Sequence, residues 1–309
     1  MENSRLKNYL ENALLIKVND FFAVKISTQL KDSLSSIFDE SINAMGKIAL
    51  NLANLNIKYP NLKNPKFYAY IVPNENFKEY LDFPEQFNVK GGGKPVECFE
   101  EDGFNCAYGM SVNMLQGFVN PPMHRHINHI HEFAHLIQSE FFMNRILGEG
   151  FADAFCFYTL GFEDKFLPFN QTICQLKNDD IFSVKQLMEF QKNGSFDFKR
   201  GTSQYNMCSF RLSYISSYLF VRACLEKIEK IYKCNRFQAT QKFLDIMFEI
   251  KSFGFNMFCE LSDKLGFDKN ILINTNQEQL KIIEKIKLLN KGNNGKSFEN
   301  EVAKHHTSL

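Results

Sequence analysis

Two histidines four residues apart, in the stretch HIHEFAHLIQ at residues 130–139, constrain the fold of this chain more than any other feature. In an α-helix such residues lie above one another on one face, so His131 and His135 can direct ring nitrogens at a common point. A strand would hold them too far apart. Apolar residues recur around the pair with helical spacing: Ile127, Ile130, Phe133, Ala134, Leu136 and Ile137. We therefore expect a helix that is buried along part of its surface and presents both imidazoles together.

Paired imidazoles of this kind fit the geometry of a zinc site. Two histidines leave a catalytic Zn²⁺ short of one protein ligand, which usually comes from elsewhere in the chain, and a fourth position stays open for water. Glu132 follows His131 and lies about 100° around the helix from it. That direction places its carboxylate beside the water rather than on the metal, where it can act as a general base.

The stretch ILGEGFADAF at residues 146–155 offers the missing ligand. Glu149 and Asp153 are again four residues apart, and on a helix they share one face. Glu149 is the candidate third ligand. Asp153, one turn further along, can accept a hydrogen bond from the non-ligating nitrogen of a zinc-binding histidine.

Together the two stretches resemble the gluzincins, zinc metallopeptidases with HExxH on one helix and an EGxxD-type sequence on the next. The resemblance covers about residues 65–225, and its specific motifs lie within 131–153. It implies one Zn²⁺ per chain, a peptide or protein substrate, and hydrolysis of a peptide bond by a metal-activated water. It also implies a role for each motif residue, with ligands His131, His135 and Glu149, general base Glu132, and Asp153 supporting His131.

The resemblance implies two further features outside the motifs. In the family an extended substrate pairs with an edge strand of a small sheet, which we expect within residues 107–119. A tyrosine on a later helix faces the zinc in several gluzincins, and Tyr214 in SYISSYLFVRACL matches it, with Tyr205 and Tyr218 as neighbouring alternatives. Such a hydroxyl would donate to the oxyanion.

The chain departs from the family pattern at two points. Gly148 stands where a bulky aromatic residue often precedes the glutamate, and the chain has no tryptophan, which puts the local packing in doubt. The chain also lacks a GxMEN-like stretch, with which the aminopeptidase branch holds a free amino terminus. We therefore expect an endopeptidase.

The remaining sequence predicts an α+β fold that is mostly α, with a small antiparallel or mixed sheet beside a helical core and an N-terminal amphipathic helix. Residues 29–57 have the spacing of one amphipathic helix, KFYAYIV at 66–72 that of a strand, and 77–81 that of a short helix. Later helices are expected around 124–143, 148–160, 184–192, 205–232, 236–250 and 276–290. The expected organisation is an N-terminal helical segment at 1–64, a catalytic domain at 65–260 with its sheet in 65–120 and its helical part in 121–260, and a C-terminal helix and polar tail at 261–309.

Composition narrows the choice of partners. The chain has 36 basic and 35 acidic residues, so its net charge of +1 gives no general attraction to nucleic acid or anionic membrane. No stretch approaches the ~20 apolar residues of a membrane-spanning helix, and the N-terminus lacks the pattern of a secretory signal. The eight cysteines contain no CxxC pair and suit a reducing compartment. We therefore expect a cytoplasmic protein that binds neither nucleic acid nor membrane.

Two other interpretations remain open from the sequence. One is a catalytically inactive protein with the zincin fold, which binds metal and holds a peptide or partner in the cleft without turnover. The other is a helical interaction protein in which HEFAH is only part of a core helix. His124, His126 and His129 are expected to have surface or capping roles, and His305 and His306 to lie in a solvated tail.

Overall fold

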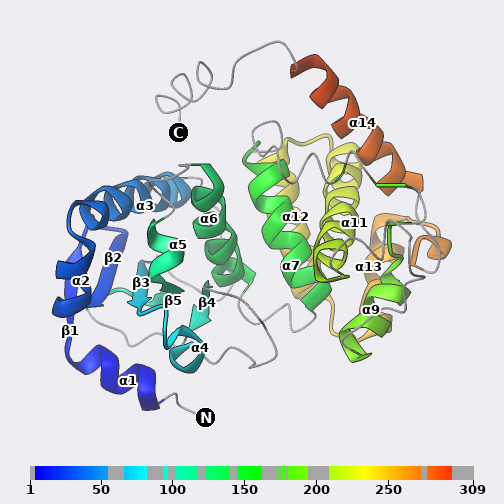
Figure 1. Cartoon of the computed structure of the whole chain (residues 1–309). Coiled ribbons are helices and arrows are strands. Elements are labelled where there is room, and N and C mark those ends of the chain that lie inside the picture. The colour runs from blue at the N-terminus through cyan, green and yellow to red at the C-terminus, as the bar shows by residue number, and fades with distance from the viewer. Residues whose placement is uncertain are drawn as a thin grey trace. The chain divides into compact units, whose positions relative to one another are not determined.

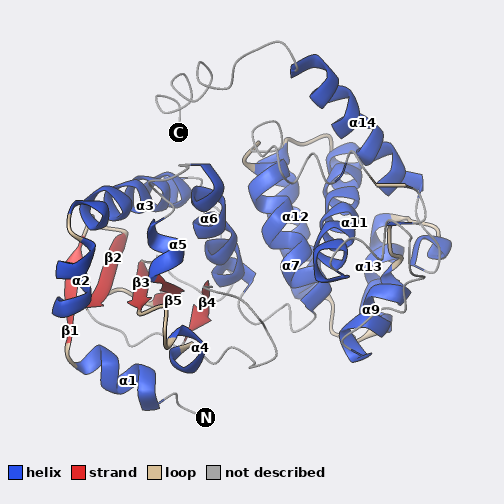
Figure 2. Cartoon of the chain, in the orientation of Figure 1, coloured by secondary structure: helices blue, strands red, loops and turns tan. Residues whose placement is uncertain are grey.

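The computed structural model describes residues 4–54, 66–81, 93–96, 102–116, 123–138, 145–161, 173, 176–177, 180–193, 209–272 and 277–293. The chain forms two compact units, Met1–Ile137 and Gln138–Ser308. Every strand in the described residues belongs to the first unit, and the described elements of the second unit are helices (Figures 1 and 2). The predicted fold class, α+β and mostly α with a small mixed sheet, is confirmed.

The first unit is built on a five-stranded sheet with the order β1-β2-β3-β5-β4. The outer pairs β1–β2 and β5–β4 are antiparallel, whereas β2–β3 and β3–β5 are parallel. Every residue of β3 and β5 is buried, as expected for central strands that are covered on both faces. The strands are β1 Ala13–Lys17, β2 Phe22–Ser27, β3 Phe67–Val72, β4 Gly93–Val96 and β5 Cys106–Ser111.

The N-terminal segment differs from the prediction in two ways. It is not purely helical, because residues 1–64 supply β1 and β2 to the same sheet as β3. The single helix predicted over 29–57 is two helices, α2 Thr28–Leu34 and α3 Ser36–Asn54. Ser35 between them has φ of 52° and ψ of −134°, a backbone conformation with positive φ that interrupts an α-helix.

The edge strand predicted within residues 107–119 is also misplaced. Residues 106–111 form β5, which lies between β3 and β4 in the interior of the sheet. The edge on this side is β4, and residues 112–116 form the short helix α5 (Val112–Gln116). The strand predicted at 66–72 and the short helix predicted at 77–81 are confirmed as β3 and α4 (Phe77–Tyr80).

Helix α6, Met123–Gln138, packs against the sheet of the first unit through Phe133. The Phe133 ring lies 4.3 Å, centroid to centroid, from the ring of Phe67 at the start of β3. Helix α1, Ser4–Glu11, is attached to the same sheet, because the Tyr9 hydroxyl donates to the carbonyl of Ile71 at 2.8 Å. The Phe133–Phe67 contact holds α6 through an apolar side chain, and the Tyr9–Ile71 hydrogen bond holds α1.

The second unit surrounds the long helix α11, Ser209–Tyr232. Helix α7, Arg145–Ala154, continues into one π-helical turn at Phe155–Thr159, and its Gly150 lies directly against the backbone of Ser217 in α11. Residues 255–265 form a helix that was not predicted. The other helices are α9 Val184–Asn193, α12 Arg236–Glu249, α13 Phe255–Leu265, the 3-10 helix Lys269–Leu272 and α14 Gln277–Asn293.

Candidate metal centre

The paired histidines lie on α6 as the sequence predicts. Ile130, Ala134 and Ile137 are buried, whereas His131 and His135 are half-buried and share a different strip of the helix surface. Their Nε2 atoms lie 3.1 Å apart, and their rings meet edge to face with centroids 4.7 Å apart. The fixed i, i+4 geometry of the helix is sufficient to bring the two nitrogens together.

The separation of the two nitrogens suits shared coordination. Tetrahedral zinc with Zn–N bonds of ~2.0–2.1 Å places two ligating nitrogens about 3.3 Å from one another. The observed 3.1 Å is close to that value. The same separation allows one imidazole N–H to donate to the other ring when no cation is bound.

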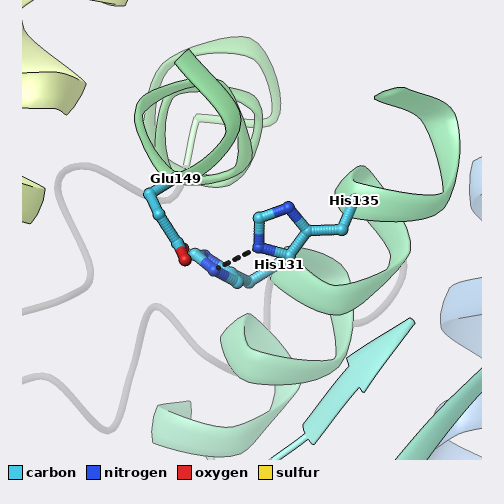
Figure 3. Close-up of side chains that lie close together, drawn as sticks. All are labelled: His131, His135 and Glu149. Carbon is cyan, nitrogen blue, oxygen red and sulfur yellow. Dashed lines mark hydrogen bonds between the residues drawn. The ribbon is translucent and has the colours of Figure 1, made fainter. Parts of the chain in front are cut away.

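Glu149, on α7, completes a group of three candidate ligands. One ligand atom from each of His131, His135 and Glu149 lies within 4.8 Å of the other two, and all three side chains are half-buried. Figure 3 shows both imidazoles and the carboxylate turned toward one another. Two imidazoles and one carboxylate are a donor set that transition metals accept, so this group could hold a metal ion.

Glu132 lies beside this group on the same helix and is only 8% exposed. A Cβ built on Gly93, the first residue of β4, would lie 3.2 Å from Glu132 Cγ, so the side chain runs past the edge strand. Burial raises the pKa of Tyr108 in β5, and the charge of Glu132 raises it further. The Glu132 carboxylate is therefore held between α6 and the β4–β5 side of the sheet.

Asp153 lies one turn after Glu149 in α7 and is 7% exposed. Its charge acts on Tyr218 in α11, whose pKa is raised first by burial and then by Asp153. Asp153 is thus in the electrostatic neighbourhood of a buried tyrosine of its own unit. The role predicted for it, support of His131, stays a prediction.

The three candidate tyrosines differ in their surroundings. Tyr218 is fully buried, and its hydroxyl accepts a hydrogen bond from Arg222 at 2.9 Å, so it belongs to the core of the second unit. Tyr214 is half-buried on α11, and its predicted role as an oxyanion donor is untested. Tyr205 lies outside the described residues.

Two polar features of the second unit were not predicted. Arg222 is buried, pairs with Glu226 at 3.2 Å and donates to the hydroxyl of Tyr218. The sequence signal that could have revealed this group is the i, i+4 spacing of its three residues on α11. Gln138, three residues after His135, donates from its side chain to the carbonyl of Gly148 at 2.7 Å. For Gln138, the sequence signal is a polar residue on an otherwise apolar helix surface.

Helix α6 begins at Met123, so the backbone of His124 lies in this helix about 10 Å along the axis from that of His131. The side chains of His124, His126 and His129 lie outside the described residues, as do His305 and His306.

Two predictions about the chain as a whole can be compared with the structure. Among the described helices, none combines the length and the apolar character needed to cross a bilayer. Free thiols are found at Cys106, Cys156, Cys224, Cys234 and Cys259.

No protein-family model matches this chain, and neither a curated protein nor a solved structure is significantly similar to it.

Proposed function

We propose that this protein is a zinc-dependent peptidase of the gluzincin type that cleaves internal peptide bonds. The observation that carries the proposal is the group formed by His131, His135 and Glu149, which come from two helices and bring their ligand atoms within 4.8 Å of one another. A two-histidine, one-glutamate set is the ligand type of catalytic zinc sites such as that of thermolysin, which leave one position open.

The donor set favours a transition metal such as zinc over Mg²⁺ or Ca²⁺. Mg²⁺ and Ca²⁺ prefer oxygen ligands, whereas two imidazole nitrogens favour a transition metal. The three ligand atoms lie within 4.8 Å of one another, and rotation about the Glu149 side-chain torsions can adjust the carboxylate to the ~2.0–2.2 Å bonds that zinc forms.

When bound, Zn²⁺ would polarise the scissile carbonyl and lower the pKa of a water toward ~7. Glu132 would take a proton from that water as it attacks the carbonyl carbon, and would then deliver the proton to the leaving amine. The hydroxyl of the consumed water would end in the product carboxylate, and its proton on the product amine. Asp153 would orient the ring of His131, and Tyr214 would donate to the oxyanion.

The edge strand supports a peptide as the substrate. β4 is at the end of the described sheet, and its Gly93 lies against Glu132. A peptide that adds to the outer edge of β4 through main-chain hydrogen bonds would pass close to the carboxylate of the proposed base. In this arrangement the peptide backbone, rather than a particular side chain, would lie next to the reacting groups.

Metal analysis of the full-length chain tests the site. After reconstitution with ZnCl₂ and removal of excess metal, we expect one zinc per chain, and we expect His135→Ala and Glu149→Ala to lower the content strongly. Wild-type protein that retains no zinc would remove the basis of the proposal.

Hydrolysis is tested with a peptide library of mixed sequence, in which new termini are detected by mass spectrometry. Glu132→Gln should keep its zinc and lose cleavage, because the changed residue is not a ligand. Glu79→Gln is the matched control, since it makes the same chemical change at an exposed position of α4, where Glu79 forms a surface ion pair with Arg5. Zinc binding without cleavage by the wild type would instead favour the peptide-binding protein considered above.

A further inference from the structure

Gln138 ends α6 and is almost completely buried, with 3% of its surface exposed. Its side-chain Nε2 donates to the backbone carbonyl of Gly148 at 2.7 Å. A buried amide that lost this acceptor would keep the full cost of its desolvation, so the bond is one that the fold cannot easily give up. Gly148 directly precedes Glu149 in α7.

Gly150, on the other side of Glu149, is held by a different contact. A Cβ at this position would lie 2.5 Å from the carbonyl oxygen of Ser217 and 2.6 Å from its carbonyl carbon. The backbone of α7 therefore touches the backbone of α11 at this residue. Glu149 thus lies between two fixed points. The carbonyl before it accepts a hydrogen bond from Gln138, and Gly150 after it touches the backbone of α11, so the Glu149 Cα has little freedom to move.

We propose that Gln138 is a positioning residue for the metal site, which acts by fixing the first turns of α7 so that the Glu149 carboxylate is held where the cation binds. This inference rests on the proposed zinc site. Gln138 and His135 are in the same helix, three residues apart, so the bond joins the helix that carries the two imidazoles to the peptide unit before the third ligand. Gln138 touches neither metal nor substrate, and its effect passes entirely through Glu149.

The principal test is the zinc affinity of Gln138→Met, measured in the full-length protein by competition with a chromophoric chelator. Methionine has nearly the same length and no N–H, so the side chain keeps its volume and loses the bond to Gly148. We expect zinc affinity to fall by about 10- to 100-fold, the range found when a residue supporting a metal ligand is removed.

Gln279→Met is a matched control. Gln279 in α14 is 2% exposed and donates from Nε2 to the carbonyl of Ser216 in α11 at 3.2 Å. The control therefore loses a buried bond of the same type in the same unit, and neither of the two bonded residues belongs to α6 or α7. We expect a similar shift in denaturation midpoint for both variants and a loss of zinc affinity for Gln138→Met alone.

A double-mutant cycle with Glu149→Gln separates positioning from a general structural role. If Gln138 acts through Glu149, the double variant should bind zinc no more weakly than Glu149→Gln alone. Additive losses in the double variant would overturn the inference, and so would wild-type affinity in Gln138→Met. Where Gln138→Met does not fold, Gln138→Asn retains the amide but withdraws it by about 1.5 Å, one C–C bond, and the same loss is expected. Failure of the wild type to bind zinc would instead refute the proposed metal site.

Discussion

Replacing Gly150 by alanine tests whether α7 and α11 are in contact through their backbones. The new Cβ would lie 2.5 Å from the carbonyl oxygen of Ser217, whereas ordinary van der Waals contact begins at 3.4 Å. The difference, 3.4 − 2.5 = 0.9 Å, has to be accommodated by separating the two helices, because the atoms that clash belong to the backbone.

The expected cost follows from two opposing effects. Overpacking a close-packed contact destabilises by typically ~1–3 kcal/mol, and an overlap between two helix backbones belongs at the upper end of that range. Alanine in place of a helical glycine recovers up to ~1 kcal/mol through helix propensity. We therefore expect Gly150→Ala to lower the free energy of unfolding by about 2 kcal/mol, measured as the shift in a urea transition followed by circular dichroism.

Gly46→Ala in α3 is the matched comparison. Its Cβ would meet Val18 Cγ1 at 2.6 Å, nearly the same overlap, and Asn19 Nδ2 at 3.1 Å, but these atoms belong to partly exposed side chains that can shift, not to the backbone of a packed helix. We expect this variant to be as stable as the wild type, or up to ~1 kcal/mol more stable through helix propensity. Gly150→Ala with a midpoint equal to or above that of Gly46→Ala would refute the backbone contact.

Two further predictions concern buried ionisable groups of the first and second units. Burial raises the pKa of both Tyr108 and Tyr218, so in a spectrophotometric titration they should stay protonated in the folded chain well above pH 10. The unfolded chain loses these protons first, near pH ~10. The stability that the two protonated tyrosines contribute is therefore present below that pH and is lost as the pH rises above it. Ionisation of every tyrosine near pH 10 in folded protein would contradict the burial of Tyr108 and Tyr218. Glu132→Gln should raise the urea midpoint of the zinc-free protein, because a neutral amide costs less to bury than a carboxylate, and a lowered midpoint would show that the carboxylate stabilises the fold.

The sequence predicts those parts of the site that depend on local geometry. The approach of His131 to His135 follows from helix periodicity alone, and the two nitrogens are 3.1 Å apart. The position of Glu149 relative to them does not follow from its distance along the chain. The position of Glu149 depends on the packing of α7. Two contacts fix this helix: Gln138 donates to the carbonyl of Gly148, and Gly150 touches the backbone of Ser217. Helix periodicity predicts neither contact, because α7 contributes backbone atoms to both.

The strands of the N-terminal segment were missed because their signal is weak without their partners. ALLIK and FAVKIS are short apolar runs, and periodicity does not distinguish a short buried strand from part of a helix. β2 is fixed as a strand by parallel pairing with β3, in which Phe22 lies opposite Phe67. The break at Ser35 is likewise hard to predict, because serine has no special preference for a conformation with positive φ.

The error over the edge strand has an identifiable cause. Gly93 and Pro95 are residue types that interrupt most strands, so the stretch containing them gives only a weak strand signal. Proline lacks an N–H and is tolerated in a strand at the edge of a sheet, which is where β4 lies. Pro95 was therefore a sign of an edge strand.

Glu132 carries the distinction between a hydrolase and a protein that only binds metal. Both would use the same three ligands, but only the hydrolase has a use for a carboxylate beside them. Glu132 is held at 8% exposure against the edge strand, and its charge raises the pKa of a buried tyrosine, so the fold accepts a desolvation cost that glutamine at the same position would lower. Stability given up at a site in exchange for reactivity is common in enzymes. A variant that gains stability and loses only cleavage would show this exchange at Glu132, whereas a core helix with no catalytic task would gain stability and lose nothing.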